Sequence, residues 1–149
     1  MTNQKELQMK HFVLGFVFDI SREQVLLVCK TKPKWQAGCW NGIGGKIEKG
    51  EIPLEAMNRE AAEETKCRYD FEHSINFVCP GGTVFVFKAT IGTSGRIPFQ
   101  QVEREVLDIW PVNSLPMKIM NNLKWLIPLC LSTIQMPIIL QQNTLGVNG

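Results

Sequence analysis

The stretch from residue 44 to residue 67 constrains this chain most, because a glycine turn leads there into an acidic helical pattern. Glu60, Glu63 and Glu64 are spaced by three and four positions, so a helix beginning near Pro53 would place the three carboxylates on one face. Like charges so close repel each other unless a cation lies among them. Carboxylate oxygens are ligands that Mg²⁺ and Mn²⁺ prefer. The pattern therefore predicts a metal-binding helix, and such helices usually serve phosphate chemistry.

The same stretch resembles the Nudix box. That motif is Gly, five residues, Glu, seven residues, Arg-Glu, an apolar residue, any residue, Glu-Glu, any residue, Gly and an apolar residue. The matching positions, between residues 45 and 67, are Gly45, Glu51, Arg59, Glu60, Ala61, Glu63, Glu64 and Cys67. Lys66 departs from the motif, because the family usually has a glycine there to end the helix in a left-handed conformation. A solvated Glu-rich helix face would explain the acids alone, but not the placement of the glycine and Arg59.

The resemblance implies an α/β (α+β) fold: an α/β/α sandwich whose catalytic helix packs against a mixed β-sheet. It also implies that Glu60, Glu63, Glu64 and the carbonyl of Gly44 bind Mg²⁺, with Mn²⁺ as the second possibility. Arg59 is expected to pair with Glu51 and hold the loop against the helix. Glu60 is our candidate general base, since a carboxylate near both water and metal can accept the proton.

Many family members recruit one more acid from a strand after the box. We predict Glu105 for this role, because an acid, then a tryptophan, then Leu-Pro is a frequent family pattern and Trp110 follows here. Glu103 is the competitor, since two residues on one strand point to the same face. Both could instead be edge charges that discourage sheet pairing.

Substrate selection must come from outside the box. The run from Trp40 to Lys46 resembles the entry to the box in MutT-like members that hydrolyse oxidised purine nucleoside triphosphates. In that reading Asn41 hydrogen-bonds a purine edge, and Trp35 stacks on the base. The alternatives are a turn-capping asparagine and a hydrophobic plug.

Two further residues are predicted to contact the substrate, and each also has an ordinary explanation without such a contact. Asn122, with Asn121 before it, occupies a region that contributes base contacts in such members, or else caps a helix. Lys46, with Lys32 and Lys34, could meet phosphates, although exposed lysines usually have no specific role.

The remaining pattern predicts strands around the box helix. The expected strands are 11–19, 24–30, 40–43, 69–78, 83–91 and 105–112, with a turn at 80–82, an exposed loop at 92–101 and a helix at 121–131.

Composition fits one domain over residues 1–149, with the C-terminal helix and an extended tail at about 120–149. The run Leu126–Leu140 is apolar but interrupted by Pro128 and Pro137, so we expect no membrane span there. It could also offer an apolar surface to a second subunit, which leaves monomer and homodimer open.

Charge and cysteine content bear on the compartment of the protein and on its binding partners. The five cysteines are odd in number and scattered, which favours reduced thiols and a cytoplasmic protein. The polar N-terminus lacks the apolar region of a signal peptide. A net charge of +2 gives no reason to expect nucleic-acid binding.

Three functions compete. The first is a metal-dependent hydrolase that cleaves a nucleoside triphosphate, with 8-oxo-dGTP or another non-standard purine nucleotide preferred, to a monophosphate and pyrophosphate. The second keeps this chemistry for ADP-ribose or another nucleoside diphosphate linked to a second group. The third is a non-catalytic binding module, which would typically have lost box glutamates that this chain retains.

Overall fold

The computed structural model describes residues 10–132 and 138–141. Its strands and helices follow in the order β1 (Lys10–Phe18), β2 (Gln24–Cys29), the short 3₁₀ helix η1 (Lys34–Gln36), β3 (Trp40–Asn41), β4 (Ile43–Lys46), α2 (Pro53–Thr65), β5 (Glu72–Cys79), β6 (Gly82–Thr90), β7 (Val106–Pro111), α3 (Leu123–Leu131) and β8 (Ile138–Gln141).

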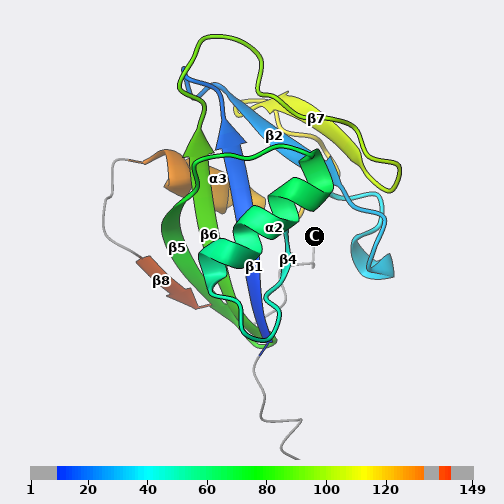
Figure 1. The fold of residues 1–149 in the computed structure, drawn as a ribbon, viewed down its shortest axis with the longest axis vertical. Coiled ribbons are helices and arrows are strands. Elements are labelled where there is room, and N and C mark those ends of the chain that lie inside the picture. Colours follow the sequence, from blue (N-terminus) through cyan, green and yellow to red (C-terminus); the bar gives the residue numbers. More distant parts are fainter. Residues whose placement is uncertain (1–9, 133–137, 142–149) are drawn as a thin grey trace, which may run out of the picture.

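One mixed sheet organises these elements (Figure 1). β1 runs through its middle, parallel to β6 on one side. On its other side β1 pairs at its end with β2 and over residues 12–15 with β4, both antiparallel. β2 in turn pairs with β3 and, along its whole length, with β7. This split edge of β1 brings the end of β2 and the glycines of β4 close to one another.

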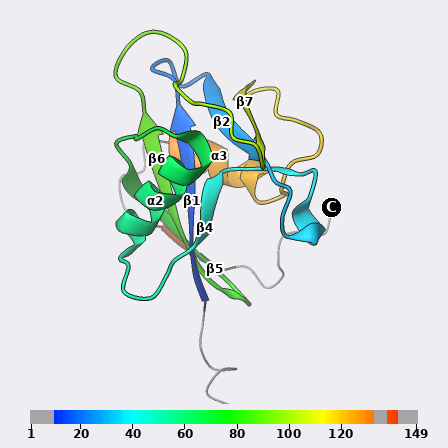
Figure 2. The same ribbon diagram turned by 45° about the vertical axis from the view of Figure 1, so that its right-hand side comes forward.

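The two helices cover opposite faces of the sheet, which confirms the predicted sandwich (Figures 1 and 2). On one face, Ala56, Met57 and Ala61 of α2 pack against alternate apolar residues of β1, β2 and β6. On the other face, Leu123, Leu126 and Ile127 of α3 form a second core with the intervening residues of the same strands. α2 is thereby fixed with its acidic side turned away from the sheet core.

Local signals explain where α2 begins and ends. Pro53 occupies the first turn, where its missing N–H costs nothing, and the amide of Ile52 donates to Glu55 Oε1 at 3.0 Å. The helix ends at Thr65 and is capped by Lys66, whose φ of 59° lies in the left-handed region. Lys66 stands where the Nudix box usually has glycine, and it still adopts the left-handed conformation. This costs about 1 kcal/mol relative to glycine.

Most expected elements are present with shifted bounds; the strand predicted at 69–78 is Glu72–Cys79, and the helix predicted at 121–131 begins at Leu123. The predicted strand at 40–43 is two strands, β3 and β4, divided at Gly42. The predicted strand at 105–112 begins one residue later and ends one earlier, so Glu103 and Glu105 both precede β7. After α3, residues 138–141 form a strand that pairs parallel with β5.

Parts of the sequence predictions lie outside the described residues: the polar N-terminus at 1–9 and the tail at 133–137 and 142–149. None of the described helices is long and apolar enough to cross a membrane.

Candidate active site

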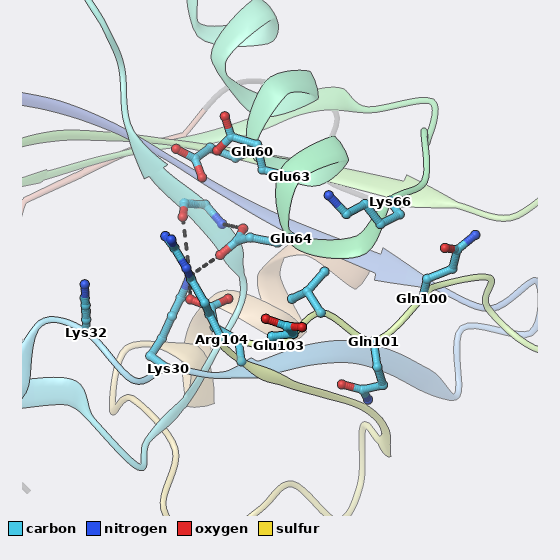
Figure 3. A pocket seen from close by; sticks show the side chains of 13 residues that line it. Lys30, Lys32, Glu60, Glu63, Glu64, Lys66, Gln100, Gln101, Glu103 and Arg104 are labelled. Atoms are coloured by element: carbon cyan, nitrogen blue, oxygen red, sulfur yellow. Dashed lines mark hydrogen bonds and ion pairs between the residues drawn. The ribbon is translucent and has the colours of Figure 1, made fainter.

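A cavity of about 1060 Å³ opens beside the C-terminal half of α2. Figure 3 shows its side chains: the acids of α2 on one side, Lys30 at the end of β2 below them, and the segment 100–105 opposite. Its lining residues are Lys30, Lys32, Gly44, Glu60, Glu63, Glu64, Lys66, Gln100, Gln101, Val102, Glu103, Arg104 and Glu105. All four predicted acidic ligands and the predicted carbonyl ligand thus meet in one cavity.

Arg59 clamps the loop that precedes the helix, as the sequence predicted. Its Nε and Nη2 donate to the two carboxylate oxygens of Glu51 at 2.8 and 3.0 Å, and Nη2 also donates to the carbonyl of Lys46 at 3.0 Å. Such forked pairs are the stronger class of hydrogen bond. The hydrogen bond from Arg59 lowers the pKa of the Glu51 carboxyl, so this acid stays ionised.

The same guanidinium also contacts the outer acids of the helix. Nη1 of Arg59 donates to Glu60 Oε1 at 3.0 Å and lies 3.6 Å from Glu63 Oε2. The side chain of Glu60 is largely buried, whereas that of Glu63 is 60% exposed. Burial raises the pKa of the Glu60 carboxyl, and Arg59 acts in the opposite direction.

Glu64, one helical turn after Glu60, has a different environment. Its Oε2 accepts the amide of Gly44 at 2.9 Å, and its Oε1 accepts Lys30 Nζ at 2.5 Å. Both side chains are buried. Burial raises the pKa of Glu64 to about 8, while the ammonium of Lys30 works to lower it. From the sequence, Lys30 is only the last residue of the predicted strand 24–30 and has no predicted role, so the structure adds it to the cavity.

Glu103 and Glu105 do not share a strand face, contrary to the sequence prediction. Both lie in the turn before β7, where the bridge between Val102 and Glu105 bends the chain. Glu105 points inward, with Oε1 3.9 Å from Lys30 Nζ, while Glu103 is exposed. The geometry therefore favours Glu105 over its competitor as the additional acid.

The donor set suits a hard divalent ion. Four carboxylates and the carbonyl of Gly44 line one cavity, and Glu105 Oε2 is buried with no hydrogen-bond partner. Within residues 10–132 and 138–141, however, no three His, Cys, Asp or Glu side chains converge closely enough to hold a metal. In the described arrangement Lys30 and Arg59 pair with several of these acids, and the ligand set remains a prediction.

Gly44 and Gly45 lie in strand β4 and not in the turn expected from the sequence, and both are needed for close approach. A Cβ at Gly44 would collide with the backbone carbonyl of Val13, across the β1–β4 pair. A Cβ at Gly45 would collide with the carboxylate of Glu60. The absence of side chains lets β4 lie against β1 while the helix acids reach β4.

The predicted base-contacting residues lie around β3. Asn41 accepts the amide of Gly42 at 2.8 Å and donates to Gln36 Oε1 at 3.1 Å, so it does support the turn. Asn122 occupies the N-cap position of α3, but its side chain makes no capping hydrogen bond, and its buried Oδ1 has no partner. Trp35 is 59% exposed, which excludes a hydrophobic plug. Lys46 is exposed and contributes its carbonyl to Arg59.

Backbone contacts bring these distant segments together. Ile119 pairs with Trp40, and the amide of Met120 donates to the carbonyl of Trp40 at 3.0 Å. The ring of Trp110 meets that of Trp40 edge to face at 5.3 Å, and its buried Nε1 has no hydrogen-bond partner. We call the region of Asn41, Trp40, Trp110 and Asn122 the β3 end; none of these four residues lines the acidic cavity.

Comparisons with known proteins agree with this geometry. The oxidized purine nucleoside triphosphate hydrolase of Danio rerio is 40% identical over 63 residues, and that of Mus musculus 36% over 62 residues. These alignments cover 42% of this chain, and only 40% and 39% of the respective relatives.

Solved structures match over a longer span. The MutT protein of Bacillus halodurans superimposes with a TM-score of 0.69 at 25% identity, covering 91% of each chain. An ADP-ribose pyrophosphatase of Streptococcus suis has a TM-score of 0.68 at 16% identity, covering 89% of this chain and 99% of that one, which shows the shared fold alone.

A family model, the NUDIX domain, matches residues 10–125, from the first described strand into α3. That match takes in the whole box, its Arg59 clamp and the acidic cavity, so this chain belongs to the Nudix family.

Proposed function

We propose that this chain is a metal-dependent pyrophosphohydrolase that cleaves a nucleoside triphosphate to a monophosphate and pyrophosphate. The observation that carries the proposal is the cavity in which Glu60, Glu63, Glu64, Glu105 and the Gly44 carbonyl face a common space. Its volume of about 1060 Å³ is large enough for a nucleotide.

Both signs of charge in this cavity suit a polyphosphate. Lys32, Lys66 and Arg104 also line it and supply cationic groups for phosphate oxygens. The acids and the Gly44 carbonyl would hold Mg²⁺ or, less favoured, Mn²⁺, which when bound supplies the charge that offsets repulsion between the phosphates and an attacking water.

Glu60 is our candidate for the proton acceptor. Its carboxylate is mostly buried beside the glycines of β4, and burial raises its pKa, which makes it a better base. Arg59 keeps the carboxylate oriented through Oε1.

For the substrate, we propose an oxidised or otherwise non-standard purine nucleotide, with 8-oxo-dGTP as the first compound to test. Support comes from the partial match to oxidized purine nucleoside triphosphate hydrolases and from the polar atoms at the β3 end. Asn122 Oδ1 and Trp110 Nε1 are buried and have no hydrogen-bond partner, an arrangement suited to recognising the edge of a base.

The test is a panel of ordinary and oxidised nucleoside triphosphates, ADP-ribose and dinucleoside polyphosphates, scored with Mg²⁺ for release of pyrophosphate and of nucleoside monophosphate. We expect monophosphate and pyrophosphate from an oxidised purine nucleotide, with loss of turnover in a chelator. Faster cleavage of ADP-ribose would replace the substrate assignment and keep the chemistry. No hydrolysis of any compound would reject the proposed function.

A further inference from the structure

Lys30 is the most unusual side chain of the cavity, because a lysine is rarely buried so completely. It is 8% exposed, directly after a strand whose residues 25–28 are all buried. Burying an ammonium is unfavourable unless oxygen acceptors compensate for the lost water. Its surroundings must therefore supply those acceptors.

Three oxygens surround the ammonium, and each belongs to a residue predicted to bind the metal. Nζ lies 2.5 Å from Glu64 Oε1, 3.4 Å from the carbonyl oxygen of Gly44 and 3.9 Å from Glu105 Oε1. Figure 3 shows the side chain reaching up from β2 into this group. The ammonium thus occupies the meeting point of oxygens that would also attract a divalent ion.

The two cations pair with different acids. Arg59 pairs with Glu51 and also contacts Glu60 and Glu63, while Lys30 pairs with Glu64 and lies near Glu105. The buried carboxylate oxygen Glu105 Oε2 accepts no hydrogen bond. An ion entering between Glu64 and Gly44 would meet the Lys30 ammonium at close range and be repelled by it.

We propose that Lys30 is an internal counter-ion of Glu64, competes with the divalent ion for Glu64 and the Gly44 carbonyl, and moves away from both when the ion binds. This inference rests on the proposed metal-dependent function. It predicts that the ammonium weakens metal binding, since each ion must first displace it.

Metal binding itself provides the test. Mn²⁺ alone is titrated into the full chain, its Lys30→Met variant and a Lys32→Met control, and dissociation constants are measured by calorimetry and by the electron paramagnetic resonance of free Mn²⁺. Lys32 lines the same cavity but is exposed, so its variant removes the same formal charge without breaking the ion pair between Lys30 and Glu64. We expect Lys30→Met to bind Mn²⁺ about tenfold more tightly or better, and Lys32→Met to stay near the parent value.

The outcomes separate the two proposals. If the parent chain binds no Mn²⁺ and hydrolyses nothing, the proposed function fails. If the parent binds Mn²⁺ and Lys30→Met binds it no more tightly than Lys32→Met, the competition is overturned while the function stands.

A measurement on the parent chain covers the case in which Lys30→Met does not fold. Amines are acetylated briefly with and without saturating Mg²⁺, and the modification of each lysine is quantified by mass spectrometry. Release from Glu64 should raise the labelling of Lys30 several-fold in Mg²⁺, with Lys32 as the internal reference. Unchanged labelling of Lys30 at Mg²⁺ saturation would overturn the proposal.

Discussion

The acidic cavity and the β3 end differ in how the chain builds them. The cavity draws most of its acids from one helix, where residues three and four apart must share a face. The β3 end is assembled from β3, β7 and the start of α3, which are distant in sequence; residues 118–120 contact Trp40 through the backbone, and Trp110 of β7 contacts it through its ring. The proposed catalytic acids are therefore encoded largely by local sequence, whereas the proposed base contacts depend on tertiary structure.

The largest expected effect tests the cavity. Glu63→Gln and Glu64→Gln should each reduce turnover by about 10²-fold or more, because each removes a charge from the proposed metal site. Circular dichroism should show a retained fold. Glu72→Gln, on the exposed side of β5, is the matched control and should leave turnover near the parent value. Parent-like hydrolysis by either box variant would show that its carboxylate is not a ligand.

Next in size is the clamp that holds the cavity in shape. Arg59→Gln removes the bonds to Glu51, Glu60 and the Lys46 carbonyl, and should lower the free energy of unfolding by about 1–3 kcal/mol. Urea denaturation measures this, with exposed Arg68→Gln as the charge-matched control. Equal stability of the two variants would mean that the clamp contributes nothing to folding.

At the β3 end, Asn41→Ala and Asn122→Ala should change the ranking of nucleotide substrates by about tenfold while leaving the Mg²⁺ dependence unaltered. Specificity ratios, as kcat/KM for oxidised against ordinary purine nucleotides, measure this. Asn113→Ala, exposed in the turn after β7, is the control. An unchanged ranking for Asn41→Ala would leave that side chain with its turn-supporting bonds alone.

The smallest effect on the protein itself is expected at Trp35. Because its ring is exposed, Trp35→Ala should change the free energy of unfolding by no more than about 0.5 kcal/mol. If the ring stacks on the base, KM should rise about fivefold or more. Met117→Ala, at a side chain 98% exposed, gives the reference for losing a surface apolar group. A KM equal to that of Met117→Ala would remove Trp35 from the site.

The same contrast explains which features the sequence could predict. The box predicted α2 and the Arg59–Glu51 pair because helical periodicity and a short loop fix both. It could not predict the orientation of Glu105, which depends on a turn before β7 and on a partner 75 residues away at Lys30.

Lys30 itself was missed because a lysine after a strand resembles a solvated one in sequence. A usable signal was nevertheless present. The strand before it is apolar at four successive positions, which is typical of a strand covered on both faces, so the residue continuing it was a candidate for burial. The parallel pairing of 138–141 with β5 depends on long-range contacts and left no comparable pattern.

The Arg59 clamp also bears on insertions and deletions. One guanidinium holds the carbonyl of Lys46 and the carboxylate of Glu51, so it closes the connection from β4 to α2 into a ring. Within that ring Gly50, whose φ is 88°, and Ile47, which packs against the core under α2, are constrained, and an added or lost residue would separate ends that a single side chain must reach. The length of the segment between Gly45 and Glu51, five residues, therefore sets the distance between β4 and the start of α2.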